Sequence, residues 1–233
     1  LLRRVNWEDG VTVWTTPRSG VTAGHCGVAL AGDAIYAIDA AVGGSVLRRY
    51  DLATGALVYE GPLMPGTSLQ NTPFVGPDGT VYVARTQGST AVDFVYAFTD
   101  DGNEIVQRWA LPAAWSTASE FAVAADNSVY VLTPGNLLSR VQGSTGAVLT
   151  STPAPIGGGG GLQVRVAVDA GGRVFVSNGQ FSTGRLYSFN ADLTPRWDVP
   201  VTNINVGAPA LSSDGTLVVA GTGTNLKAYR TAA

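Results

Sequence analysis

The sequence has few of the residues that usually build reactive or metal-binding sites. Its 233 residues include one cysteine and one histidine, and charged residues make up 13%. One cysteine cannot form an intramolecular disulfide or a cysteine-rich metal site, and one histidine argues against a zinc or copper centre. The net charge of −3 comes without a basic cluster, which argues against nucleic acid and anionic membranes. We therefore expect no metal, no cofactor and no nucleic-acid partner.

Long hydrophobic runs are also missing. The longest apolar region, residues 27–44, is interrupted by Asp33 and Asp39, which indicates strands rather than a membrane span. Insertion into a membrane is not expected. What the chain has in quantity is glycine, 30 residues of it, which favours many tight turns.

Short apolar triplets recur along the chain at a nearly constant interval. They begin at residues 35, 81, 129, 174 and 217, so the steps are 46, 48, 45 and 43 residues. A turn pair precedes each triplet, as in Asp78-Gly79 and Asp214-Gly215, and such pairs accept the positive φ angles of two-residue hairpin turns. We expect a first strand before each turn, at residues 27–30, 72–75, 121–124, 164–168 and 208–211.

Third and fourth strands complete each copy. The third strands are expected at residues 46–50, 94–98, 137–141, 185–189 and 225–229. Most fourth strands end in an aromatic residue, which we expect to dock on the next repeat: Trp14, Tyr59, Trp109 and Trp197. Thr150 stands at this position in the third copy, so docking there is expected to be imperfect.

Four short strands in about 45 residues are typical of a β-propeller blade. The predicted fold is all-β, a single propeller domain over residues 1–233 built of four-stranded antiparallel blades, with five blades' worth of repeats. The expected blades span 21–67, 68–115, 116–159, 160–203 and an incomplete 204–233. Residues 1–15 repeat a third and a fourth strand. Either Val11–Thr15 closes a five-blade ring, or the chain is part of a ring of six to eight blades, which we favour.

The repeat resembles the PQQ-like repeat of quinoprotein-type propellers. The best copy is NTPFVGPDGTVYVARTQGSTAVDFVYAFTDDGNEIVQRWAL (71–111), followed by GAPALSSDGTLVVAGTGTNLKAYR (207–230). The resemblance implies one of two kinds of protein. Some members are periplasmic dehydrogenases that hold pyrroloquinoline quinone and calcium on the axis, usually beneath two adjacent cysteines. Others are cofactor-free binding scaffolds, among them BamB-like lipoproteins. A single cysteine favours the second kind.

Candidate binding residues lie just before or at the start of each first strand, where the chain is expected to line the central funnel. They are Gln70, Asn71, Ser119, Glu120, Gln163, Arg165 and Asn205. His25 and Cys26 are adjacent, so on a strand their side chains point to opposite faces and form no nucleophile–base pair. The pair Asp100-Asp101 lies in a hairpin turn, where aspartate serves the backbone. No catalytic residue is assigned.

The leading hypothesis is a non-catalytic extracytoplasmic propeller that binds another protein or a surface glycan. The alternative is an enzyme with an axial active site, either a degenerate PQQ-type oxidoreductase or a glycan-acting hydrolase or lyase. An axial enzyme requires at least two ionisable groups, or a metal, converging at the funnel, whereas a scaffold does not.

Overall fold

The computed structural model describes residues 1–19, 27–66, 69–70, 72–86, 93–114, 121–156, 163–180, 183–201, 209–220 and 226–230. Every regular element in these ranges is a β-strand, and every strand pairing among them is antiparallel. The predicted fold class, an all-β propeller of four-stranded antiparallel blades, is confirmed.

Five sheets follow a terminal hairpin. The hairpin consists of β1 (Leu2–Val5) and β2 (Thr12–Thr16). Blade I contains β3 (Ala29–Ala31), β4 (Ala34–Ala41), β5 (Gly44–Asp51) and β6 (Leu57–Glu60), with β7 (Met64–Pro65) paired to β5. Blade II contains β8 (Leu69–Gln70), β9 (Phe74–Val75), β10 (Val81–Thr86), β11 (Asp93–Asp100) and β12 (Ile105–Ala113).

Blade III contains β13 (Phe121–Val123), β14 (Ser128–Thr133), β15 (Leu137–Gln142) and β16 (Val148–Ser151). Blade IV contains β17 (Gln163–Val168), β18 (Val174–Gln180), β19 (Thr183–Phe189) and β20 (Pro195–Val201). Blade V contains β21 (Ala210–Leu211), β22 (Thr216–Ala220) and β23 (Leu226–Arg230).

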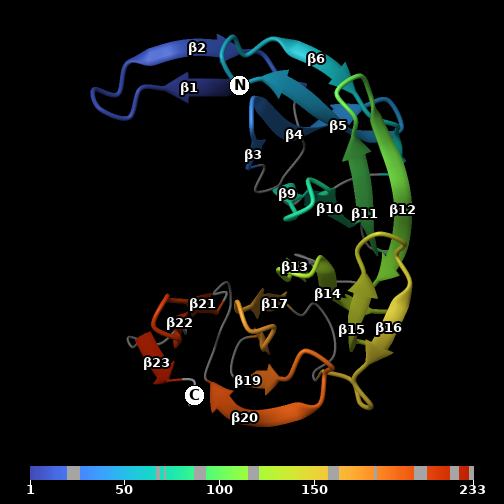
Figure 1. The fold of residues 1–233 in the computed structure, drawn as a ribbon, viewed down its shortest axis with the longest axis vertical. Helices are drawn as coiled ribbons and strands as arrows, with labels where there is room; N and C mark the ends of the chain where they lie inside the picture. The colour runs from blue at the N-terminus through green and yellow to red at the C-terminus, as the bar shows by residue number, and fades with distance from the viewer. Residues whose placement is uncertain are drawn as a thin grey trace.

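The blades follow one another around an open arc (Figure 1). The first strands lie on the inner side of the arc, and the fourth strands β6, β12, β16 and β20 lie on its outer side. β2 pairs with β1, and β23 pairs with β22, so Leu2–Val5 has a partner strand. The terminal hairpin and blade V lie at the two ends of the arc.

The hairpin and the blades share one register between the third and fourth strands. In each third strand, the register shifts directly after the residue that pairs with the docking position of the fourth strand. The paired residues are Arg4 with Trp14, Arg49 with Tyr59, Ala97 with Trp109, Arg140 with Thr150 and Ser188 with Trp197. The same irregularity at the same place shows that β1 and β2 are the third and fourth strands of a repeat unit.

The core lies between the blades. Side chains alternate across each second strand, so neighbouring residues enter different interfaces. In β4, Ile35 packs with Leu2 of the terminal hairpin, whereas Tyr36 packs with Val81 and Phe98 of blade II. Similar apolar clusters join blades II and III, III and IV, and IV and V. Each sheet therefore keeps water off both faces only with its neighbours.

Four first strands are shorter than expected, since β3 and β13 have three residues and β9 and β21 have two. The two shortest were predicted at residues 72–75 and 208–211, but β9 starts at Phe74 and β21 starts at Ala210, with residue 208 outside the described residues. Pro73 and Pro209 precede these starts, and proline has no backbone N–H to donate to a neighbouring strand.

Candidate functional site

The structure describes three of the seven residues predicted for the central funnel. Gln70 lies in β8 opposite Arg85, and Gln163 and Arg165 lie in β17 opposite Gly179 and Ser177. Burial lowers the pKa of the Arg165 guanidinium. The remaining four, Asn71, Ser119, Glu120 and Asn205, lie outside the described residues, as do His25 and Cys26. Their convergence on one surface stays a prediction.

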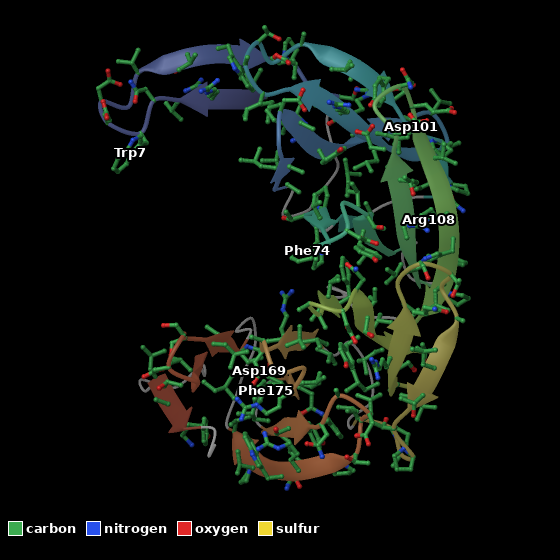
Figure 2. The ribbon with its side chains drawn as sticks, in the orientation of Figure 1. Trp7, Phe74, Asp101, Arg108, Asp169 and Phe175 are labelled. Carbon is green, nitrogen blue, oxygen red and sulfur yellow. The ribbon has the colours of Figure 1, made fainter. Side chains whose placement is uncertain are left out.

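The inner strands carry an apolar surface. Their described residues include no aspartate or glutamate, and Arg165 is the one ionisable side chain among them. Phe74 and Leu30 are exposed, and Figure 2 shows Phe74 on the inner side of the arc. Calcium binds to clustered carboxylate and carbonyl oxygens. In the described ranges no three His, Cys, Asp or Glu residues are grouped to hold a metal.

Two tryptophans on fourth strands dock in one manner on the next blade. The Trp14 indole N–H donates to the carbonyl of Leu52 at 3.2 Å, and its ring covers Gly55. The Trp109 indole N–H donates to the carbonyl of Gly143 at 2.8 Å, and its ring covers Gly146. Both carbonyls belong to the turn between the third and fourth strands. This turn is the acceptor for the preceding blade.

Tyrosines from the second strands reach the equivalent turn of the next blade, between its third and fourth strands. Tyr36 donates to the Asp100 carboxylate at 2.6 Å, and Tyr130 donates to the carbonyl of Ala191 at 2.9 Å. The Tyr82 ring lies 5.9 Å from the ring of Trp109. Blade III has Thr150 in place of the docking aromatic, so Tyr130 supplies the hydrogen bond to blade IV there. The sequence showed these tyrosines as apolar strand residues and gave no sign of their partners.

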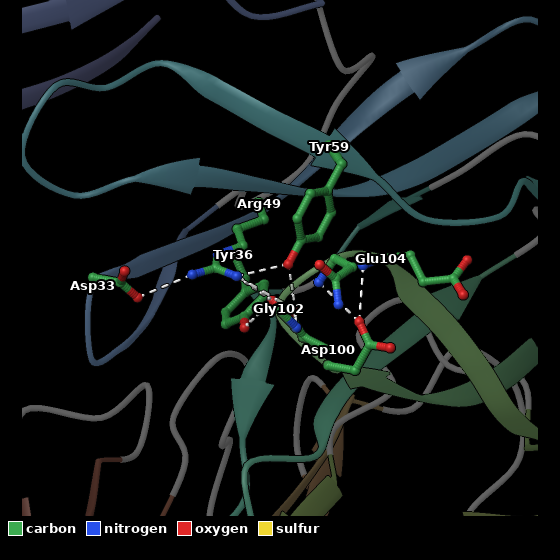
Figure 3. Close-up of polar contacts among 9 residues, drawn as sticks. Asp33, Tyr36, Arg49, Tyr59, Asp100, Gly102 and Glu104 are labelled. Atoms are coloured by element: carbon green, nitrogen blue, oxygen red, sulfur yellow. Dashed lines mark hydrogen bonds and ion pairs between the residues drawn. The ribbon is translucent and has the colours of Figure 1, made fainter.

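Hydrogen bonds and an ion pair around Asp100 join blade I to blade II (Figure 3). Its carboxylate accepts hydrogen bonds from the hydroxyls of Tyr36 and Tyr59 and from the Gly102 amide, with Arg49 3.5 Å away. Burial acts to raise the pKa of Asp100, but these hydrogen bonds and the Arg49 charge outweigh it and hold that pKa below its usual value. The Asp100 carboxylate and both tyrosine hydroxyls have partners within the cluster, and Arg49 Nε is its one buried polar atom without a hydrogen-bond partner among the described residues. This pairing indicates a structural role.

A second carboxylate is buried between the terminal hairpin and blade I. Asp39 in β4 is fully buried and accepts from Arg18 Nε at 2.7 Å, from Arg48 at 3.3 Å and from the Tyr50 hydroxyl. Arg18 also donates to the carbonyl of Ile38 at 2.6 Å. Burial and the Asp39 charge raise the pKa of Tyr50 to about 12. This cluster anchors the segment after β2 through Arg18, and the Asp39 carboxylate is paired with two arginines.

A cavity of about 320 Å³ opens between blades III and IV. One wall is the segment that leaves β16, residues 152–156, and the other is formed by β19 and β20. The wall residues from blade IV are Tyr187, Ser188, Phe189, Pro195, Arg196, Trp197 and Asp198. Half of the lining residues are prolines or aromatic residues, and the Arg196 guanidinium donates to the Ser188 hydroxyl at 3.3 Å.

The cavity lies at the interface that lacks a docking aromatic. In blade II the stacked pair Tyr96 and Phe98 is buried, and Tyr59 of blade I packs against that cluster. In blade IV the matching pair Tyr187 and Phe189 is stacked at the same 6.1 Å, but Tyr187 is only half-buried. Thr150 occupies the position of Tyr59 and is much smaller. The departure of Thr150 from the aromatic pattern was the sequence signal for this site.

Comparison with known proteins supports the fold. No family model and no curated protein matches the chain. Among solved structures, the Dos1 propeller superposes with a TM-score of 0.61 at 15% identity, over 84% of this chain and 52% of that one. The chain has a β-propeller fold. It spans about half the length of the Dos1 propeller chain.

BamB from Moraxella catarrhalis is also similar, with a TM-score of 0.43 at 13% identity, over 90% of this chain and 74% of that one. Among the described residues, no helix has the length and apolar character needed to cross a bilayer.

Proposed function

We propose that this propeller is a non-catalytic, extracytoplasmic binding module and that the cavity between blades III and IV receives an apolar side chain of a partner protein. The observation that carries the proposal is the chemistry of the cavity, which combines Tyr187, Trp197 and three prolines with one arginine at its wall. Aromatic and arginine side chains are enriched at the energetic centres of protein interfaces.

The cavity is better matched to a protein than to a glycan. A sugar-binding site needs several polar groups free to bind hydroxyls. Here both charged residues of the wall are already engaged: Asp198 is paired with Arg185, and Arg196 is hydrogen-bonded to Ser188. The volume of about 320 Å³ is at the lower end for small-molecule pockets and large enough for one aromatic side chain.

The enzyme alternative has less support. It requires at least two ionisable groups that converge at the inner strands, and Arg165 is the single ionisable side chain among their described residues. The extracytoplasmic location rests on the resemblance to PQQ-like repeats and is part of the proposal.

Peptides selected from a phage-displayed random library on the whole protein provide the test. We expect the selected peptides to bind Arg196→Ala about tenfold more weakly, a loss of about 1.4 kcal/mol. Arg108→Ala is the matched control, because Arg108 also precedes a docking tryptophan and donates to a hydroxyl, that of Thr80 at 3.4 Å. Thr150→Tyr should also reduce binding, since the added ring reaches toward the cavity.

Equal affinities of the two arginine variants would place the peptides elsewhere and contradict the proposed site. An oligosaccharide array supplies the second measurement. A glycan that binds the native protein and is displaced by no peptide would favour the glycan hypothesis.

A further inference from the structure

The turn of the terminal hairpin has the same backbone as the two turns that accept tryptophan. In residues 6–10, the Gly10 amide donates to Asn6 at 2.9 Å and the Asn6 amide donates to Val11 at 2.8 Å. The turns at residues 51–55 and 142–146 have the matching bonds at 2.8 to 2.9 Å. The φ angles of Gly10, Gly55 and Gly146 are 73°, 73° and 74°. The carbonyl of Trp7 therefore stands where Leu52 and Gly143 accept an indole N–H.

The three turns differ in what covers the glycine. A Cβ added to Gly55 would lie 2.5 Å from the ring of Trp14, and one added to Gly146 would lie 2.8 Å from the ring of Trp109. A Cβ added to Gly10 would meet nothing within 4 Å. Gly10 thus belongs to an acceptor turn that has no ring on it.

A second residue of the hairpin shows that the surface beside the turn is also uncovered. Val5 follows the register shift in its hairpin, as Tyr50, Phe98, Val141 and Phe189 do in blades I to IV. Those four side chains are 1%, 0%, 0% and 5% exposed, and each packs in the cluster shared with the preceding unit. Val5 is 50% exposed. An apolar position that is buried in four repeats is open in the fifth.

We propose that this face of the terminal hairpin docks a partner blade, a four-stranded antiparallel sheet whose outer strand carries a tryptophan at the register of Trp14. The partner indole N–H donates to the carbonyl of Trp7, its ring lies on Gly10, and its second strand covers Val5. The exposed side chains Trp7 and Val11 at the same turn extend the apolar contact. This surface lies at one end of the arc, away from the cavity between blades III and IV (Figure 1).

A second copy of the described chain fits this surface less well. Its blade V would have to supply the docking groups, and the residue there that corresponds to Tyr36, Tyr82 and Tyr130 is Val218. Valine lacks the hydroxyl that Tyr130 donates to a turn carbonyl of the next blade. A blade with a tryptophan on its outer strand provides both the donor and the ring.

The chain contains a blade with which to test the proposal. Residues 69–136, placed directly before Leu1, add a copy of blade II with Trp109 and a copy of β13 and β14. Because Arg4 corresponds to Arg140, Leu1 corresponds to Leu137, and the junction repeats the natural one. The added β14 copy can pair with β1 and complete its sheet, and the added Trp109 is then in position to reach Gly10.

The measurement is the rate at which a thiol reagent labels Val5→Cys, in a Cys26→Ser background. We expect labelling to slow at least tenfold in the extended chain relative to the native chain. Trp109→Ala in the added copy should restore the fast rate, and Gly10→Ala should raise the rate in the extended chain alone. Val42→Cys is the matched control, because Val42 is exposed in the turn between β4 and β5 and should label equally in both chains.

Equal labelling of Val5→Cys in the two chains overturns the proposal, including the case in which the added strands stay unfolded. Slow labelling that persists with Trp109→Ala in the added copy overturns the tryptophan as the docking group. Labelling of the native chain that slows with protein concentration would identify a second copy as the occupant and overturn the partner blade.

Discussion

Two glycines of blade III separate the effect of backbone strain from that of docking. Gly146 and Gly135 have φ angles of 74° and 87°, where any residue with a Cβ is strained. A Cβ at Gly135 would meet nothing within 4 Å, whereas a Cβ at Gly146 would lie 2.8 Å from Cγ and 2.9 Å from Cδ2 of Trp109. Gly135→Ala and Gly146→Ala therefore differ mainly in the contact with the docking ring.

The expected losses of stability follow from these contacts. A left-handed backbone costs a residue with a Cβ about 1–2 kcal/mol, and this applies to both variants. Overpacking adds about 1–3 kcal/mol at Gly146 alone. The Trp109 ring cannot move aside without lengthening its 2.8 Å hydrogen bond to Gly143, which keeps the clash from relaxing. The free energy of unfolding should thus fall by about 1–3 kcal/mol more in Gly146→Ala than in Gly135→Ala.

Urea unfolding followed by circular dichroism measures both losses, provided that the slope against urea is unchanged. A double-mutant cycle with Trp109→Ala isolates the contact, and the extra loss at Gly146 should disappear in that background. Equal losses for Gly135→Ala and Gly146→Ala would refute the docking explanation and leave backbone strain as the whole effect.

Three further predictions concern other interfaces. Thr150→Tyr should raise the free energy of unfolding by about 1–3 kcal/mol, because the added ring is buried between blades III and IV, and a lowered melting temperature would count against this. Asp39→Asn should lower the free energy of unfolding by about 3–5 kcal/mol, because it leaves two arginines without their buried partner. The exposed control Asp198→Asn should cost about 0–1 kcal/mol, and a similar cost for both would contradict the burial argument. The folded-state pKa of Asp100 lies below its unfolded value. The ionised carboxylate therefore contributes to the free energy of unfolding above about pH 4, and this contribution is lost as the pH falls through the folded-state pKa. Asp100→Asn should therefore flatten the acid side of a stability–pH curve, which urea midpoints at several pH values measure.

The sequence alone determined the strands, their order and their grouping into blades. Apolar triplets behind Asp-Gly turns locate the second strands because alternation and turn chemistry act within a few residues. The recurring aromatic fixed the fourth strands and marked Trp14 and Trp109 as docking residues. Thr150 was visible as a departure from this pattern, although the pattern could not show that a cavity lies beside it.

Only the tertiary structure decided which side chains meet between blades. Alternation tells that Tyr36 and Ile35 face opposite sides, but their partners lie about one blade away in the chain, and blade stacking sets the distances. For the same reason Asp100 looked like a turn residue, and its contacts with Tyr36 and Tyr59 were not predictable. Gly10 and Gly146 look alike in sequence and share one backbone conformation. Whether a ring lies on them depends on the neighbouring blade, which local sequence does not encode.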